Sequence, residues 1–144
     1  MIKKANIENL EIVSSLAKSL WPDNNLDDLR EEFTGILNDK EAAIFLKEDN
    51  EEFIGFAQCQ LRHDYVEGCD SSPVGYLEGI YIKENRRRQG FAHDLLRACQ
   101  EWACESDCLE FASDCELDNL DSLAFHLKMG FMEVNRIICF KKEL

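Results

Sequence analysis

The chain has 144 residues, of which 45% are hydrophobic, and it carries a formal net charge of -13 at pH 7. This length and apolar content are typical of one globular domain, here residues 1–144. The acidity excludes a nucleic-acid-binding surface, because phosphate contacts require a basic face. No run of about 18 apolar residues is present to span a membrane, and the N-terminus lacks the apolar run of a signal peptide. We therefore expect a cytoplasmic protein with neither a nucleic-acid nor a membrane partner.

Apolar periodicity predicts the secondary structure of the first half of the chain. We expect a strand over residues 2–6 and helices over 7–21 and 26–37. A hairpin follows, with its two strands over 42–48 and 53–63. Both helical segments carry apolar residues at three- and four-residue spacing, and Pro22 ends the first of them. The hairpin is predicted because two apolar runs flank the polar turn Asp-Asn-Glu-Glu.

The second half alternates strands and helices. We expect a strand, a long helix, a strand, a helix and a final bent strand or strand pair, over residues 75–83, 88–106, 108–114, 119–129 and 131–142. Gly130 suits the end of the last helix. The fold class is therefore mixed α/β, with helices on the faces of a mixed sheet. The first three of these elements form a crossover unit, whose ligand edge lies where the strand ends and the helix begins.

That edge carries the densest positive charge of the chain. The run of Arg87, Arg88, Gln89, Gly90, Phe91 and Ala92 has the form Arg-x-x-Gly-x-Ala. The start of a helix presents unpaired N–H groups and the positive end of the helix dipole. Glycine lets backbone approach a phosphate, and arginine adds charge-assisted hydrogen bonds. The run predicts an anion-binding loop, and a solvated turn is the alternative.

Two carboxylates are candidates for the reacting site. Glu78 lies in the middle of an otherwise apolar strand, where a buried carboxylate is costly without a partner. Asp114 ends the next strand, so the two side chains would meet in one cleft if the strands are neighbours. There Glu78 could bind a substrate ammonium or take its proton. The alternatives are a solvent-facing glutamate and a helix-capping aspartate.

The cysteines predict free thiols. The sequence has seven, with no Cys-x-x-Cys pair and no histidine pair at metal-ligand spacing. A zinc site at Cys99, Cys104 and Cys108, which lie close along the chain, is the alternative. We expect reduced, mostly buried thiols and no bound metal.

The arginine loop, the strands around it and the Lys-Met-Gly-Phe end of the following helix resemble the GNAT acyltransferase superfamily over roughly residues 50–140. The resemblance implies a mostly antiparallel mixed sheet that is splayed between its two central strands. It also implies that residues 87–92 hold the pyrophosphate of acetyl-coenzyme A. The residues implied to contact other parts of that co-substrate are Ile80, Tyr81, Ile82 and Asn119.

Four longer strings are similar to the aminoglycoside 6′-N-acetyltransferases and cover nearly the whole chain. They are Leu-Trp-Pro-Asp at 20–23 and the segments 65–82, 110–119 and 129–142. This resemblance implies that Trp21, Tyr65, Glu78 and Asp114 bind the aminoglycoside. The chain departs from the family pattern at two positions. His126 stands where many GNAT enzymes have a tyrosine that protonates the leaving thiolate, and Asn135 stands where an acidic residue would contact substrate. Core packing remains the alternative for Trp21 and His126, and an ordinary loop aromatic for Tyr65.

The resemblance implies direct acetyl transfer from acetyl-coenzyme A to the 6′-amine of an aminoglycoside, with antibiotic resistance as the result. The two reactants would be held in attack geometry, and the Ile80 N–H would polarise the thioester carbonyl. The alternatives are acetylation of another polyamine or a protein amine, and a regulator that binds acetyl-coenzyme A without turnover. A homodimer is expected from the resemblance and from the apolar C-terminal strand.

Overall fold

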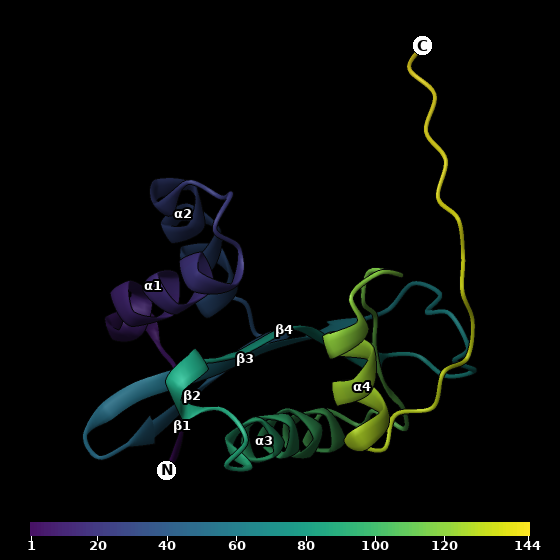
Figure 1. Ribbon diagram of the computed structural model, residues 1–144. Coiled ribbons are helices and arrows are strands. Elements are labelled where there is room, and N and C mark those ends of the chain that lie inside the picture. The colour runs from purple at the N-terminus through teal and green to yellow at the C-terminus, as the bar shows by residue number, and fades with distance from the viewer.

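The computed structural model describes all of residues 1–144 (Figure 1). Its elements are β1 (Ile2–Lys4), the 3-10 turn η1 (Ile7–Asn9), α1 (Leu10–Leu20), α2 (Leu26–Leu37), β2 (Ala42–Asp49), β3 (Glu52–Arg62), β4 (Val74–Ile82), the 3-10 turn η2 (Glu84–Arg86), α3 (Phe91–Glu105), β5 (Phe111–Ser113) and α4 (Leu120–Lys128). No helix is long and apolar enough to cross a membrane.

The five strands form one sheet in the order β1-β2-β3-β4-β5. The first three pairings are antiparallel and the last, between β4 and β5, is parallel. The predicted mixed, mostly antiparallel sheet is therefore confirmed, and so is the adjacency of the two strands that carry Glu78 and Asp114.

Helices cover both faces of the sheet (Figure 1). The amphipathic helices α1 and α2 bury Val13, Leu29 and Phe33 against Phe56 and other side chains of one face. On the opposite face α3 buries Leu95, Leu96 and Trp102 in a second apolar cluster. Each fully buried large side chain contributes about 1.5–3 kcal/mol to folding. These two cores hold the central strands rigidly.

The strands β4 and β5 separate soon after they meet. They pair only from Gly75 to Leu77 on β4 and from Phe111 to Ser113 on β5, whereas β4 continues to Ile82. The sheet is therefore splayed at this point, as expected, and one edge of the last part of β4 is left without a strand partner.

Several elements differ from the sequence predictions. The strand predicted over 2–6 ends at Lys4, and the helix predicted over 7–21 is divided into the 3-10 turn η1 and the helix α1, which begins at Leu10. The helix predicted from residue 88 begins at Phe91, because Arg88 and Gly90 have φ of +64° and +82°, which a helix does not allow. The strand predicted over 108–114 is limited to Phe111–Ser113. The strand or strand pair predicted over 131–142 is absent: residues 131–144 form an extended segment, the C-terminal arm, that leaves the body of the molecule (Figure 1). An isolated strand has no backbone partners, and no other part of the chain pairs with the arm.

Candidate active site

Glu78 lies on a β-bulge of β4. Gln58 of β3 faces Gly79, whereas the next residue, Cys59, faces Leu77, so Glu78 is the extra residue between them. A bulge of this kind re-aims a side chain and is frequent beside active sites. The Glu78 carboxylate accepts two hydrogen bonds from Arg62, from Nε at 3.0 Å and from Nη2 at 2.9 Å. The mid-strand carboxylate therefore has a partner, as its burial requires.

A chain of side-chain contacts connects Glu78 to Asp114. The Arg62 guanidinium carbon lies 3.4 Å from the centre of the Tyr76 ring, and the Tyr76 hydroxyl donates a hydrogen bond to Asp114. Burial of Tyr76 and this hydrogen bond to Asp114 raise the pKa of Tyr76, so the phenol stays protonated. Glu78, Arg62, Tyr76 and Asp114 form one continuous network, hereafter the carboxylate network.

Trp21 borders the carboxylate network. It follows the last residue of α1 and packs against Phe33 and Phe56, with ring centroids 6.4 and 6.2 Å apart. A Cβ added at Gly79 would lie 2.8 Å from the Trp21 ring, so the absence of a side chain at Gly79 admits the indole. Trp21 is therefore a core residue that also packs over Gly79, the residue that follows Glu78.

Tyr65 and Asn135 lie on a different part of the structure. Tyr65 belongs to the loop of residues 63–73 and is 77% exposed. The Asn135 side chain donates a hydrogen bond to Glu67 of that loop, at 2.5 Å, and Val134 packs against Gly68. The start of the arm is thus fastened to the loop that carries Tyr65, but neither residue contacts the carboxylate network.

His126 reaches the splay point from α4. Its Nδ1 lies 2.7 Å from the Ser122 carbonyl oxygen, which can only accept, and its Nε2 lies 2.7 Å from Ser113 Oγ. In a neutral ring the proton is therefore on Nδ1, and Nε2 can accept a hydrogen bond from the Ser113 hydroxyl. Ser113 is the last residue of β5 and directly precedes Asp114.

The three arginines of the predicted anion loop have different roles. Arg86 forms ion pairs with Asp49 and Glu52 of the β2–β3 turn, so its guanidinium is not available to an anion. Arg87 donates to the Ile82 carbonyl oxygen at 2.8 Å, and Arg88 is exposed with no ion-pair partner. The following helix α3 has no side-chain cap at its N-terminus. A Cβ at Gly90 would meet nothing within 4 Å, so there is open space for an anion to approach the backbone.

The unpaired edge of β4 is next to this loop. Lys83 N–H bonds the Ile54 carbonyl of β3 at 2.8 Å, and backbone groups of successive strand residues point to opposite edges. The N–H groups of Ile80 and Ile82 therefore face the splay, whereas that of Tyr81 faces β3. Asn119 caps α4 by accepting from the Ser122 N–H at 3.1 Å, and its amide nitrogen has no protein partner.

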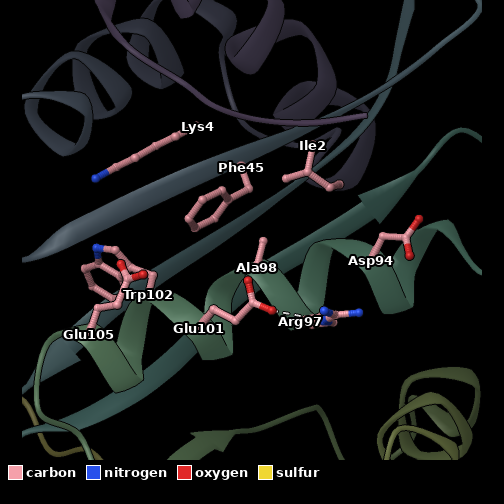
Figure 2. A pocket seen from close by; sticks show the side chains of 9 residues that line it. All are labelled: Ile2, Lys4, Phe45, Asp94, Arg97, Ala98, Glu101, Trp102 and Glu105. Atoms are coloured by element: carbon pink, nitrogen blue, oxygen red, sulfur yellow. Dashed lines mark hydrogen bonds and ion pairs between the residues drawn. The ribbon is translucent and has the colours of Figure 1, made fainter.

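A cavity of about 460 Å³ lies elsewhere, between α3 and the strands β1 and β2 (Figure 2). Figure 2 shows Ile2 and Phe45 projecting from the strands toward α3, which contributes Trp102 beside Glu105 and the pair of Arg97 and Glu101. None of the sequence-predicted site residues lines this cavity. We do not assign the reaction to this cavity on its size. The candidate reacting groups converge at the carboxylate network, which lies outside it.

All seven cysteines are free thiols. The expectation that they are mostly buried is wrong, since Cys104, Cys115 and Cys139 are exposed. A hydrogen bond with Cys59, together with burial, raises the pKa of Cys99 well above its usual value. Cys99 is therefore held as a thiol and is a poor nucleophile.

Sequence reasoning missed Arg62, Tyr76 and Ser113. Arg62 and Tyr76 reach Glu78 and Asp114 only through the register of the β3–β4 hairpin and its bulge. Ser113 was overlooked although it directly precedes Asp114 at the end of a predicted strand. Its position there was the one available signal, because functional side chains gather at the carboxyl ends of strands.

Known proteins are similar to this chain in sequence and in fold. The acetyltransferase (GNAT) family model matches residues 9–131. An aminoglycoside N(6′)-acetyltransferase type 1 of Serratia marcescens is 41% identical and aligns with 100% of this chain and 99% of its own length. One of the same name from Stenotrophomonas maltophilia is 40% identical, with coverages of 99% and 93%.

Solved structures agree. AAC(6′)-Iy in complex with the bisubstrate analogue CoA-S-monomethyl-acetylneamine has a TM-score of 0.96 and 38% identity, covering 100% of this chain and 98% of that one. Apo AAC(6′)-Ig from Acinetobacter haemolyticus has a TM-score of 0.95 and 35% identity, with coverages of 100% and 99%.

Proposed function

The chain belongs to the acetyltransferase (GNAT) family, and we propose that it transfers the acetyl group of acetyl-coenzyme A to the 6′-amine of aminoglycoside antibiotics. The observation that supports this most is the carboxylate network, which lies beside Trp21 where β4 and β5 separate. It offers two carboxylates to a polycation and an aromatic wall to a sugar ring. Resistance to the antibiotic follows from the modification.

The residues around the splay fit acetyl-coenzyme A. The open space at Gly90, the uncapped start of α3 and Arg88 suit the pyrophosphate. The free N–H groups of Ile80 and Ile82, with the Asn119 amide, suit the remainder of the molecule. When bound, acetyl-coenzyme A supplies an activated acetyl group as a thioester. The chain supplies binding, orientation and proton transfer within a single domain.

The carboxylate network would bind and orient the acceptor. Glu78 and Asp114 attract its ammonium groups, and Trp21 packs against the ring. Tyr65 and Asn135 would close over a bulky acceptor from the loop and the arm. An asparagine in place of an acidic residue gives a hydrogen bond without a charge, so we expect the range of accepted aminoglycosides to differ from that of relatives with a carboxylate.

We propose that His126 exchanges its proton through Ser113. Ser113 Oγ lies 2.7 Å from His126 Nε2 and 3.4 Å from the Leu77 carbonyl oxygen, and Nδ1 is occupied by the Ser122 carbonyl. A proton released by the reacting amine would pass through the Ser113 hydroxyl to Nε2, and the same path returns it when the thiol leaves. This role replaces direct proton donation by His126, since both of its ring nitrogens already have partners.

Ser113→Ala is expected to lower kcat by about 10-fold or more while leaving the KM for the aminoglycoside nearly unchanged, because a proton path is lost and no binding group is removed. Ser106→Ala is the matched control, since its hydroxyl donates only to the Trp102 carbonyl at the far end of α3. An unchanged kcat in Ser113→Ala would exclude the path.

We also propose a cytoplasmic homodimer. Most of the exposed large apolar side chains lie in the last third of the chain: Leu109, Leu117, Leu120, Leu127, Met132, Val134, Ile137, Ile138, Phe140 and Leu144. α4 buries no residue, and β5 has a free outer edge. The arm of a second copy, seated along β5 and α4, would cover these surfaces and make β4 and β5 central strands. The free thiols support a reducing compartment.

The experiment for the activity is release of coenzyme A thiol by the purified protein, with kanamycin or tobramycin as acceptor. An analogue with a hydroxyl at the 6′ position is the matched control, and spermidine tests the polyamine alternative. We expect turnover with the antibiotics alone. Turnover mainly with spermidine would favour the alternative acceptor, and co-substrate binding without turnover on any amine would favour a regulator.

A further inference from the structure

The carboxylate network already contains a cation. Arg62 holds both oxygens of Glu78, at 3.0 and 2.9 Å, and no other basic side chain contacts the network. A polycationic acceptor would therefore find Glu78 occupied by a group of its own charge. The Glu78 side chain is only 22% exposed, so the carboxylate has little access to compensating water while Arg62 is in place.

Arg62 is held loosely for so central a residue. Glu78 is the only side chain of the protein to which it donates hydrogen bonds, and its remaining contact is the face of the Tyr76 ring. Its side chain is 41% exposed and stands at the last residue of β3, beside the 63–73 loop. A partly exposed ion pair of this kind contributes little net free energy, so a competing cation can break it.

We propose that Arg62 is an internal substitute for the substrate ammonium, which occupies Glu78 in the free enzyme and is displaced when the acceptor binds. Acceptor binding at Glu78 is then an exchange of one cation for another, and Arg62 limits the affinity for the aminoglycoside. This inference rests on the proposed function. The exchange also explains how the negative charge of the half-buried Glu78 keeps a positive partner between turnovers.

The exchange has a consequence for Glu78. Glu78 accepts two charge-assisted hydrogen bonds from Arg62, one at each carboxylate oxygen. As long as Arg62 is in place, both oxygens of Glu78 are engaged by its guanidinium. Displacement of Arg62 therefore couples occupation of the acceptor site to the release of Glu78.

The test is a calorimetric titration with kanamycin in the presence of saturating coenzyme A, which fills the co-substrate site and has no acetyl group to transfer. Arg62→Ala should bind kanamycin about 3- to 10-fold more tightly than the wild type, because the competing ion pair is gone. Arg62→Lys should lie between the two. Arg97→Ala removes the same charge from an exposed pair with Glu101 and should leave the Kd nearly unchanged.

Unchanged or weaker binding by Arg62→Ala, with a wild type that binds kanamycin, overturns the exchange and leaves the proposed function intact. A wild type and an Arg62→Ala variant that both fail to bind any aminoglycoside overturn both. Coenzyme A affinity reports that the variant is folded. As an independent measurement, the Arg62 Nε–H signal in the NMR spectrum should begin to exchange rapidly with water when kanamycin is added to the wild type. A signal that stays protected contradicts displacement.

Discussion

Glu78→Gln is expected to lower kcat/KM for kanamycin by about 100-fold or more, since a carboxylate that anchors the reacting ammonium is lost. Glutamine keeps the shape of the side chain and the bulge, but it is neutral and cannot compensate Arg62. The unpaired guanidinium then repels a polycation from the same cleft. Both effects act in the same direction, so this substitution should have the largest effect of any in the site.

Steady-state kinetics with both substrates varied will check this result. The KM for acetyl-coenzyme A should change little, because Glu78 lies on the acceptor side of the splay. Glu101→Gln is the matched control: it removes the same charge from an exposed residue of α3 that is paired only with Arg97. If Glu78→Gln keeps more than half of the wild-type kcat/KM, Glu78 does not bind the reacting amine.

Phe140→Asp is expected to convert a dimer to a monomer, with dimerisation weakened by at least about 100-fold. The Phe140 side chain is 91% exposed in the isolated chain, and its neighbours Ile137 and Ile138 are 66% and 80% exposed. Apolar side chains at this density on an extended segment require a partner surface. A buried aspartate at the centre of that surface would have no counter-charge.

Light scattering on a sizing column will report the mass of each variant. Lys142→Asp introduces an acidic residue two positions further along the arm, at a site that is already charged, and should remain dimeric. A wild type that is monomeric at the same concentration would contradict the dimer.

The helices and the order of strands could be predicted from the sequence because they depend on local periodicity. α1 and α2 form where the apolar spacing places them, and the hairpin of β2 and β3 turns at the expected polar residues. The start of α3 could not be predicted to the residue, since it depends on positive φ at Arg88 and Gly90. The arm was misassigned as a strand because its apolar pattern is real, but no strand of the same chain pairs with it.

The site was predicted as a list of residues and not as a network. Glu78 and Asp114 were identified from their positions in apolar strands, but the two side chains that connect them were not. Arg62 and Tyr76 are more than ten residues apart in the sequence and meet only because β3 and β4 pair in one register with one bulge. Register and bulge are tertiary properties, so the compensation of Glu78 by Arg62 is visible only in the folded chain.

Transfer to one particular amine can be observed by NMR of the product of a kanamycin reaction. We expect a single new acetyl group on the 6′-nitrogen, with formation of one equivalent of coenzyme A thiol. Acetylation at another nitrogen would mean that the carboxylate network orients the acceptor differently. No acetylated antibiotic under conditions where acetyl-coenzyme A binds would contradict the proposed function altogether.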